Sequence, residues 1–512
     1  MIELSTDVAI VGSGFGGSLS ALLLERIGMT SVLIDRGTHP RVVLGESSTP
    51  VADLVLQSLA AKYDLPRIAP LSKWGPWQRA YPRMTCGLKR GFSYVKHVAH
   101  EPFHPRVDYN NELHVAASNN DEDADTHWFR PEFDAFLVEE AQAAGIPFLD
   151  QTTILQLEGE GPWLLHGERA GEPVLIRAGF LLDASGEGQF VARNRQIPNT
   201  PDGMRTHSRC LWGHFTGVAR WQDQYCAAGG LAEHHPYPCD ASALHHIIDG
   251  GWMFVLPFNN GVTSAGFLLD TRQHPLDSTV SPEDEWAQLL RRYPAIGEQF
   301  ARTELTSLCG PLRRTPRLQR RARQMVGPGW AMLPLTAYAL DALNSTGNAH
   351  TLTGIERLIP IFEKRLPPSE QLESLRDYER IVNSEIDLLD EFVAGCYSAF
   401  RHFPLFASFV MFYFAGATFS ESHRRHGRHR PEHGFLLAHD QHFRSALTQA
   451  GAVLHQLADR PALTEAEITG FEDYVGELIQ PFNLAGLCDP ARHNMYPFLE
   501  LPMRVKEESE QE

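Results

Sequence analysis

The sequence predicts an α/β fold, and three observations near its N-terminus predict it. Residues 7–11 form an apolar run typical of a buried strand. A glycine-rich turn at 12–17 leads into residues 19–27, where apolar side chains recur at helical spacing. A second apolar run, at 31–34, ends at Asp35. Strand, glycine turn, helix and strand in this order typically begin a parallel sheet covered by helices.

The glycine turn has the sequence GSGFGG, and its spacing favours a dinucleotide ligand. Gly12 permits the tight turn, Gly14 allows the backbone to approach a pyrophosphate, and Gly17 allows close packing of helix on strand. The helix N-terminus favours the phosphate charge, and Asp35 is placed to accept a hydrogen bond from a ribose hydroxyl. A glycine turn alone is a weak signal, but the complete unit predicts dinucleotide binding.

The rest of the chain alternates strand and helix signals and then becomes mostly helical. A helical pattern follows Pro50 up to Ala61, and another over 132–145 ends at a glycine. Strand signals over 151–182 end at Asp183, which is suited to the far side of a bound dinucleotide. Further strands are expected at 84–98, 113–118, 209–220, 252–257 and 262–269, and further helices at 283–299, 351–364, 369–399, 403–418, 438–457 and 464–479.

Charge and cysteine content exclude several classes of function. The chain has 45 basic and 63 acidic side chains, a formal charge of −18, so binding to nucleic acid or to an anionic membrane is not expected. Its seven cysteines are scattered without a CxxC pair, which favours a reducing cytoplasm over a disulfide framework. The chain begins directly with the first strand, so no leader peptide is expected.

Two segments suggest functions that the residues do not support. Residues 405–419 are apolar but too short to cross a bilayer, which needs about 20 apolar residues, so a buried helix and no membrane span are predicted. Residues 422–442 contain six histidines. The arginines between them would repel a metal cation, so a solvated basic loop and no metal site are predicted.

Several further motifs resemble those of flavin-dependent halogenases. They lie at 45–50 (GESSTP), 86–93 (CGLKRGFS), 251–257 (GWMFVLP) and 341–347 (DALNSTG). Over most of its length the chain is similar to the tryptophan-halogenase superfamily, in the form of its phenol and pyrrole halogenases. The resemblance implies an FAD-binding Rossmann-like domain of the p-hydroxybenzoate hydroxylase type, a β-sheet substrate region and a C-terminal helical region.

The resemblance also implies domain limits. Residues 1–365 are expected to form an interleaved FAD-binding and substrate domain, with the substrate sheet mainly at 83–125 and 205–330. Residues 366–504 are expected to form the helical region, and 505–512 a charged disordered tail.

Roles for individual residues follow from the same resemblance. Reduced FAD and oxygen convert chloride or bromide to hypohalous acid, and Lys89 presents the electrophilic halogen to an electron-rich ring. Burial lowers the pKa of such a lysine. The residues expected to bind FAD are Gly12, Gly14, Phe15, Gly17, Asp35, Arg36, Glu46, Ser47, Ser48, Thr49, Arg130, Asp183, Asp341, Gly347 and Asn348. The halide is assigned to Ser345, Thr346 and Gly347 at a helix start, and the substrate pocket to Trp252, Phe254, Pro257 and Asn344.

Three positions depart from the family pattern. Phe254 replaces the second tryptophan of the 251–257 motif, and Ala342 replaces a proline. Asn344 stands where tryptophan halogenases carry a glutamate that aids deprotonation of indole. The loss of that glutamate indicates a phenol- or pyrrole-like substrate, either free or tethered to a carrier protein, rather than tryptophan. Phe254 and Ala342 bear instead on the oxygen chemistry, which they could change.

The residues leave alternatives to halogenation open. A flavin monooxygenase or dehydrogenase on the same fold would need no halide, and a non-catalytic flavoprotein would act as a binding module. Lys89 favours the halogenase, since a hydroxylase has no use for a lysine that holds hypohalite. No second nucleotide fingerprint is found, so a separate NAD(P)H-dependent flavin reductase is expected to supply FADH2.

Overall fold

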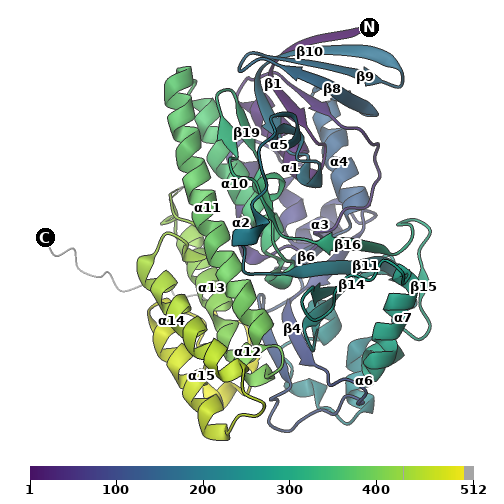
Figure 1. The fold of residues 1–512 in the computed structure, drawn as a ribbon, viewed down its shortest axis with the longest axis vertical. Coiled ribbons are helices and arrows are strands. Elements are labelled where there is room, and N and C mark those ends of the chain that lie inside the picture. Colours follow the sequence, from purple (N-terminus) through teal and green to yellow (C-terminus); the bar gives the residue numbers. More distant parts are fainter. Residues whose placement is uncertain (431, 501–512) are drawn as a thin grey trace, which may run out of the picture.

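The computed structural model describes residues 1–430 and 432–500, which form two large sheets and a C-terminal group of helices (Figure 1). The first sheet lies at the top of Figure 1, and the second lies below it near α6 and α7. A buried apolar cluster includes Val8 of the first sheet, Phe92 of the second and Phe409 of the helical region. A domain boundary at 365/366 therefore stays a prediction, and the expected tail at 505–512 lies outside the described residues.

The first sheet contains the predicted strand–turn–helix–strand unit. Its parallel core places β10 beside β1, β1 beside β2 and β2 beside β7, and β19 extends it on the other side. Helix α1 (Phe15–Arg26) follows the glycine turn and packs against α4 (Arg130–Ala143) and α10 (Thr346–Glu363). The strands are β1 (Ile2–Val11), β2 (Ser31–Ile34), β7 (Phe148–Leu149), β8 (Thr152–Glu158), β9 (Trp163–Arg169), β10 (Glu172–Asp183), β18 (Val326–Gly327) and β19 (Trp330–Met332).

The second sheet is formed by segments from three distant parts of the chain. Its order is β15-β11-β14-β13-β12-β4-β5-β21, and β16 also pairs with β11. The sequence did not predict β21, and the range 205–330 that was expected to contain most of this sheet also includes β18, which belongs to the first sheet. The strands are β4 (Gly91–Lys96), β5 (Glu112–Ala116), β11 (Ser208–Thr216), β12 (Ala243–Ile248), β13 (Gly251–Pro257), β14 (Val262–Asp270), β15 (Glu304–Leu305), β16 (Arg313–Arg317) and β21 (Met495–Tyr496).

Short elements between the sheets carry the motifs. The hairpin-like pair β3 (Cys86–Lys89) and β6 (Asp125–Trp128) is antiparallel, and β17 (Arg320–Arg321) pairs with β20 (Tyr338–Ala339). Helix α2 (Pro50–Lys62) begins where predicted, because Thr49 caps it by accepting from the Ala52 backbone N–H. The remaining short helices are α3 (Trp74–Ala80), α5 (Phe190–Asn194), α6 (Trp221–Ala227) and α9 (Pro334–Ala337).

Two predicted helices are each divided in two. The expected helix at 283–299 is α7 (Pro282–Arg292) followed by α8 (Pro294–Gln299), because a proline begins a helix readily but interrupts one. The expected helix at 403–418 is α12 (Phe403–Phe409) followed by α13 (Met411–Arg425). The other C-terminal helices are α11 (Pro368–Ala399), α14 (Gln441–Ala458) and α15 (Glu465–Ile479).

The apolar stretch of α12 and α13 is longer than the sequence suggested. Residues 403–425 are long and apolar enough, by length and composition alone, for a membrane span. However, 72% of their most apolar window is buried inside the protein. Burial of that kind is typical of a core helix, and the stretch packs against α2, α11 and α14.

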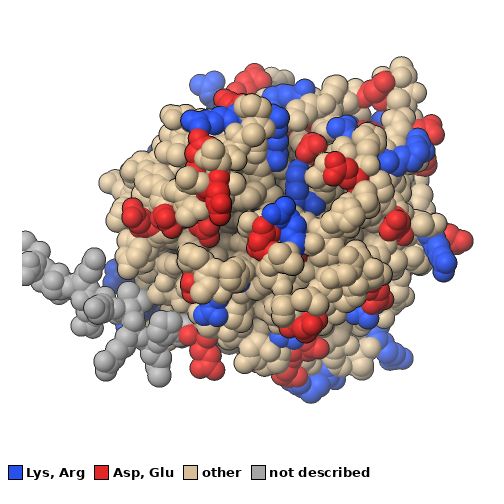
Figure 2. All heavy atoms as spheres, turned by 90° about the horizontal axis from the view of Figure 1, so that it is seen from below, with Lys and Arg blue, Asp and Glu red and all other residues tan. Residues whose placement is uncertain are grey.

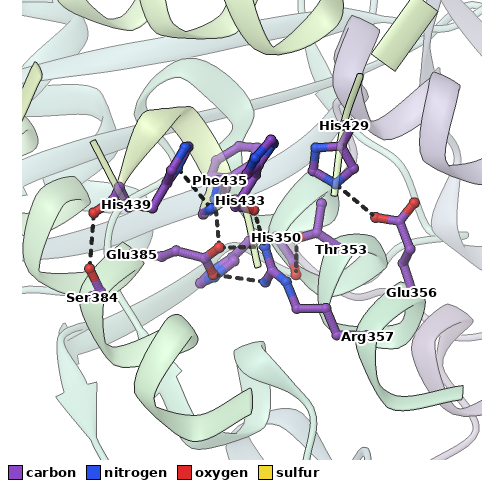
Figure 3. A network of polar contacts seen from close by, with 12 residues as sticks. His350, Thr353, Glu356, Arg357, Ser384, Glu385, His429, His433, Phe435 and His439 are labelled. Carbon is purple, nitrogen blue, oxygen red and sulfur yellow. Dashed lines mark hydrogen bonds and ion pairs between the residues drawn. The ribbon is translucent and has the colours of Figure 1, made fainter. Parts of the chain in front are cut away.

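The histidine-rich segment is only partly the solvated loop that was predicted. Glu385 of α11 accepts from the Phe435 backbone N–H at 2.5 Å and from the Arg357 guanidinium at 2.7 Å (Figure 3). His350 lies at 2.5 Å from the same carboxylate. Residues 434–438 are consequently buried, whereas most of residues 425–432 that the structure describes are exposed.

Acidic and basic side chains are interspersed over the face shown in Figure 2.

Candidate functional site

The glycine turn lies between β1 and α1, and its three glycines are needed for different reasons. Gly12 has a φ of +108°, and a Cβ there would lie 2.3 Å from the Ala184 carbonyl oxygen. A Cβ on Gly17 would lie 2.0 Å from the Gly12 oxygen. Gly14 is different, because its Cβ would come no closer than 3.7 Å to Arg130 and Asp134. The fold therefore requires Gly12 and Gly17, while the space at Gly14 is left for a ligand.

The surroundings of Gly14 fit a pyrophosphate. Gly14 is the N-cap of α1, and among the described residues no side chain caps that helix start. The backbone N–H groups of Phe15 and its neighbours are thus available to an anion. The Arg130 guanidinium lies over the Phe15 ring at 5.0 Å and donates to the Gly45 carbonyl at 2.8 Å. FAD therefore fits at this turn through its phosphates.

Three predicted FAD residues near the turn have structural roles of their own. Asp35 accepts from Ser13 N–H at 2.8 Å and from Arg41 at 2.5 Å; although burial opposes it, these contacts lower its pKa to about 2. Asp183 accepts from Ser185 and Val191 N–H, while Arg36 is exposed. Their contacts with FAD stay predictions.

The GESSTP segment connects this turn to the predicted catalytic lysine. Asn348 of α10 donates to the backbone carbonyls of Gly45 and Ser47, each at 3.3 Å. Ser48 N–H donates to the Thr126 carbonyl of β6 at 2.9 Å, and Trp128 N–H donates to the Glu46 carbonyl at 2.5 Å. The segment is therefore fixed between α10 and β6.

Lys89 lies at the end of β3 and is completely buried. Its ammonium donates to Ser47 Oγ at 2.9 Å, to the Ser48 carbonyl at 2.5 Å and to Ser345 Oγ at 3.4 Å. All three acceptors are uncharged, and the Phe92 ring lies 4.0 Å away. Burial lowers the pKa of Lys89 to about 7, although the nearby Asp125 and Asp53 oppose that shift. The lysine therefore changes protonation near neutral pH.

A neutral histidine extends this contact. His127 Nε2 lies 3.2 Å from the Ser242 carbonyl and must donate to it, so Nδ1 accepts from Ser47 Oγ at 3.2 Å. Burial, with Lys89 beside it, lowers the pKa of His127 to about 3. Ser47 is thus oriented to receive a hydrogen bond from Lys89.

The predicted halide loop reaches the same place. Asn344 and Ser345 adopt the left-handed conformation, with φ of +60° and +56°. Thr346 and Gly347 then begin α10, where backbone N–H groups point out of the helix start. Lys89 and Ser345 of this loop, 256 residues apart in sequence, lie within hydrogen-bond distance of each other. Halide binding by this loop stays a prediction.

Asp341 organises the loop from its buried end. It accepts from Trp252 Nε1 at 3.2 Å, from Tyr397 OH at 2.9 Å and from Ser208 Oγ. The predicted pocket residue Trp252 lies on β13, and its indole N–H already donates to Asp341. Phe254 lies 6.3 Å from it between ring centroids, and Pro257 ends the strand.

Asn344 faces the aromatic cluster around Lys89. Tyr94 OH donates to Asn344 Oδ1 at 2.7 Å, and the Tyr94 ring stacks on His245 at 4.5 Å. Within the described part of the chain, Asn344 Nδ2 is buried without a hydrogen-bond acceptor. A buried donor of this kind is costly unless it is paired, so this amide is suited to a ligand.

Sequence reasoning missed two buried polar clusters. Glu46 Oε1 lies 2.7 Å from His214 Nε2; although burial opposes it, this pairing raises the pKa of His214 to about 10. His114, His235 and Cys239 have metal-ligand atoms within 4.8 Å of one another. Glu112 is hydrogen-bonded to both of these histidines, each at 3.1 Å, and Cys239 Sγ to His235 Nδ1, so this cluster is a complete hydrogen-bond network. His114 lies on β5, whereas His235 and Cys239 lie between α6 and β12, so no local sequence pattern reveals the cluster.

Comparisons with known proteins agree with this geometry. Monodechloroaminopyrrolnitrin halogenase PrnC of Pseudomonas fluorescens is 28% identical over 413 residues, which span 79% of this chain and 70% of that protein. Tetracycline 7-halogenase of Kitasatospora aureofaciens is 28% identical over 411 residues, spanning 78% and 71%. No protein-family model matches the chain.

Solved structures give the same fold. The halogenase PltM, crystallised with phloroglucinol and FAD, superimposes with a TM-score of 0.85 over 96% of this chain and 99% of its own, at 24% identity. The expected α/β fold, with a second sheet and C-terminal helices, is thus confirmed. By sequence and by fold, the chain is a relative of the flavin-dependent halogenases.

Proposed function

We propose that the protein is an FADH2- and oxygen-dependent halogenase that transfers electrophilic chlorine or bromine to a phenol- or pyrrole-like ring. The observation that supports this most is Lys89, which is buried among neutral acceptors and lies 3.4 Å from the Ser345 hydroxyl of the halide loop. A lysine placed there for stability alone would be paired with a carboxylate.

When bound, reduced FAD supplies the chemistry that turns oxygen and halide into hypohalous acid. The chain's own residues hold it: the start of α1 and Arg130 for the phosphates, and residues 45–49 and 346–348 for the rest. The Thr346 and Gly347 N–H groups at the start of α10 are the donors for the halide. Trp252 and Asp341 keep that loop in place.

Lys89 receives the hypohalous acid as a neutral amine. Its nitrogen forms a bond to halogen, the O–X bond breaks, and water leaves with one amine proton. The aromatic ring then attacks the halogen, the N–X bond breaks, and the ring proton replaces the halogen on nitrogen. Each cycle thus returns the amine unchanged. A pKa of about 7 keeps a large share of the lysine in this form at neutral pH.

The substrate is a small ring that activates itself. Asn344 has no carboxylate with which to deprotonate an indole, and its free Nδ2 donor suits the oxygen of a phenol or phenolate. We expect turnover of a resorcinol-like phenol in preference to tryptophan. The same assay with the ring attached to a carrier protein distinguishes a free substrate from a tethered one.

The reducing partner and cellular location are part of the proposal. A separate NAD(P)H-dependent flavin reductase supplies FADH2, since only one nucleotide fingerprint is present in the sequence. Anaerobic mixing with NADH alone should leave the flavin absorbance bands intact. Cytoplasmic location is consistent with seven cysteines that are all free.

The test is incubation with FAD, reductase, NADH and bromide over a panel of phenols and pyrroles, read by mass spectrometry. Brominated product is expected, and it should disappear in halide-free buffer. Hydroxylated product in the presence of bromide would instead establish the monooxygenase alternative, which Phe254 and Ala342 favour.

FAD placement has its own test. Gly14→Val should fold normally, because, apart from neighbours along the chain, the nearest atoms to an added Cβ would be those of Arg130 and Asp134, at 3.7 Å. Flavin affinity should nevertheless collapse, since the branched side chain fills the pyrophosphate space. Equal flavin binding by variant and parent, measured by fluorescence titration, would refute the placement.

A further inference from the structure

A second buried lysine lies beside Lys89, in a different environment. Lys73, at the start of α3, places Nζ 2.8 Å from Asp125 Oδ1 and 3.0 Å from Asp53 Oδ2. Both carboxylates are fully buried, and Lys73 is 8% exposed. Asp53 comes from α2 and Asp125 from β6, so three elements converge on one ion cluster.

This cluster contacts Lys89 by two routes. In the β3–β6 pair, Asp125 is the direct cross-strand partner of Lys89. In addition, Ser48 Oγ donates to Asp53 Oδ1, while the carbonyl of the same Ser48 accepts from Lys89 Nζ. A change of charge in the cluster therefore acts on Lys89 electrostatically. It also acts by shifting Ser48, which is hydrogen-bonded to both Asp53 and Lys89.

The other groups that face Lys89 are uncharged or paired. His127 of β6 and His245 of β12 are buried, which lowers the pKa of each to about 3 and keeps them neutral. Tyr413 of α13 stays protonated because burial raises its pKa. Glu421 lies on the same helix beside Arg425. The cluster of Lys73, Asp53 and Asp125 thus carries the charges that influence Lys89 most.

The charge of the cluster is adjustable. Burial raises the pKa of Asp53 well above its usual value, with Asp125 beside it contributing, while Lys73 opposes the shift. In the dry interior each change of one charge acts strongly on a neighbouring ammonium.

We propose that Lys73, Asp53 and Asp125 are positioning residues that set the charge state of Lys89 and hold the Ser47–Ser48 segment against it. The catalytic relevance of this inference rests on the proposed halogenase function, but the effect on Lys89 itself does not.

The direct test is a titration of Lys89 by NMR in the full chain with oxidised FAD bound. The chain has only six lysines, so [6-¹³C]lysine gives few signals, and Lys89→Met identifies one of them. Asp125→Asn removes a negative neighbour, so the midpoint of Lys89 should fall by about one pH unit or more. Asp53→Asn should lower the midpoint less, because burial favours the protonated form of Asp53. Lys73→Met removes a positive neighbour, so the midpoint should rise.

Opposite directions distinguish electrostatic control from damage, since general disruption would move all variants alike. Lys73→Arg keeps the charge and should keep the parent midpoint. The matched control is Asp249→Asn, which removes the partner that lies 2.8 Å from Lys96, the third buried lysine. It should shift the signal of Lys96 and leave that of Lys89 in place. If Lys73→Met does not fold, the two isosteric Asp→Asn variants still decide the question.

An unchanged Lys89 midpoint in both Asp→Asn variants would overturn the inference. The pH profile of bromination should move with the NMR midpoint, by about tenfold in rate per pH unit on the titrating limb. Shifted NMR midpoints in a protein that does not brominate would refute the proposed function and leave the charge coupling standing. Bromination by the parent, with unchanged Lys89 midpoints in the variants, would instead support the proposed function and refute the charge coupling.

Discussion

Lys73 and Lys89 are both buried, yet they are held in opposite states. Burial alone would lower the pKa of either lysine. At Lys73 the ion pairs with Asp125 and Asp53 overcome that effect and raise its pKa. At Lys89 the contacts are two hydroxyls and a carbonyl, and the pKa falls to about 7. The partner and not the depth of burial decides whether a lysine serves stability or chemistry.

The largest expected effect is on Lys89 itself. Lys89→Ala should reduce halogenation by about 10²- to 10⁴-fold, the range typical of a lost catalytic group. Oxygen consumption should continue, with hypohalite or peroxide released into solution. Lys89→Arg should be similarly inactive, because a guanidinium stays protonated. An oxygen electrode paired with mass spectrometry separates the two activities, and normal halogenation by Lys89→Ala would contradict the assignment.

The next effect distinguishes the two lysines by stability. Lys73→Met leaves two buried carboxyl groups without their cation and should cost about 3–5 kcal/mol of unfolding free energy. Lys89→Met leaves only neutral acceptors. Because the folded pKa of Lys89 is below its unfolded value, its burial opposes folding at neutral and acidic pH, and this cost fades as pH rises toward 10. At pH 6 we therefore expect Lys89→Met to be at least as stable as the parent in urea. If Lys89→Met lost more unfolding free energy than Lys73→Met, the proposed difference between the two lysines would be wrong.

A single substitution should give Lys89 an ion-paired environment like that of Lys73. Ser47→Asp places a carboxylate where Lys89 now has a hydroxyl, which should raise its pKa by about 1–3 units. In the parent, halogenation should rise with pH around a midpoint near 7, as the amine becomes neutral. In the variant that midpoint should move upward, leaving little activity at pH 7. A rate that falls as the parent passes pH 7 would show instead that the ammonium form is the active one.

The smallest effect removes a neutral partner. Ser47→Ala deletes one acceptor of Lys89 and should cost about 0.5–1.5 kcal/mol of transition-state stabilisation, a loss of a few-fold to about tenfold in kcat/KM. The pH midpoint should stay near that of the parent, since no charge is removed. A midpoint shift as large as that of Ser47→Asp would mean that Ser47 acts by another route.

The sequence predicted those parts of the molecule that depend on neighbours along the chain. The glycine turn, the strand before it and the helix that begins at Pro50 follow from local rules, and all formed as expected. The motifs that contain Lys89 and Ser345 were recognised only because they resemble those of one family, and their contact was not expected. Their distance and the burial of Lys89 required the structure.

The ion cluster beside Lys89 had no local signal. Lys73, Asp53 and Asp125 lie on three elements, and each looks like an ordinary surface residue in sequence. The same holds for His114 and Cys239, which come together only when β5 meets the segment before β12. The packing of residues 434–438 depends likewise on a tertiary contact, the hydrogen bond from the Phe435 backbone N–H to Glu385. Patterns of period and composition carry no information on such juxtapositions.

The pairing of β21 with β5 affects how the protein is assembled during synthesis. Strand β21 follows every other strand in chain order, yet it completes the edge of the second sheet, where Met495 and Tyr496 pair with His114 and Val115. Until those residues leave the ribosome, the outer edge of β5 lacks its partner and is open to pairing with other chains. Nascent protein is therefore exposed to misassembly from the synthesis of β5 until that of β21, so slower elongation over this interval would prolong the risk and a chaperone that covers strand edges would reduce it.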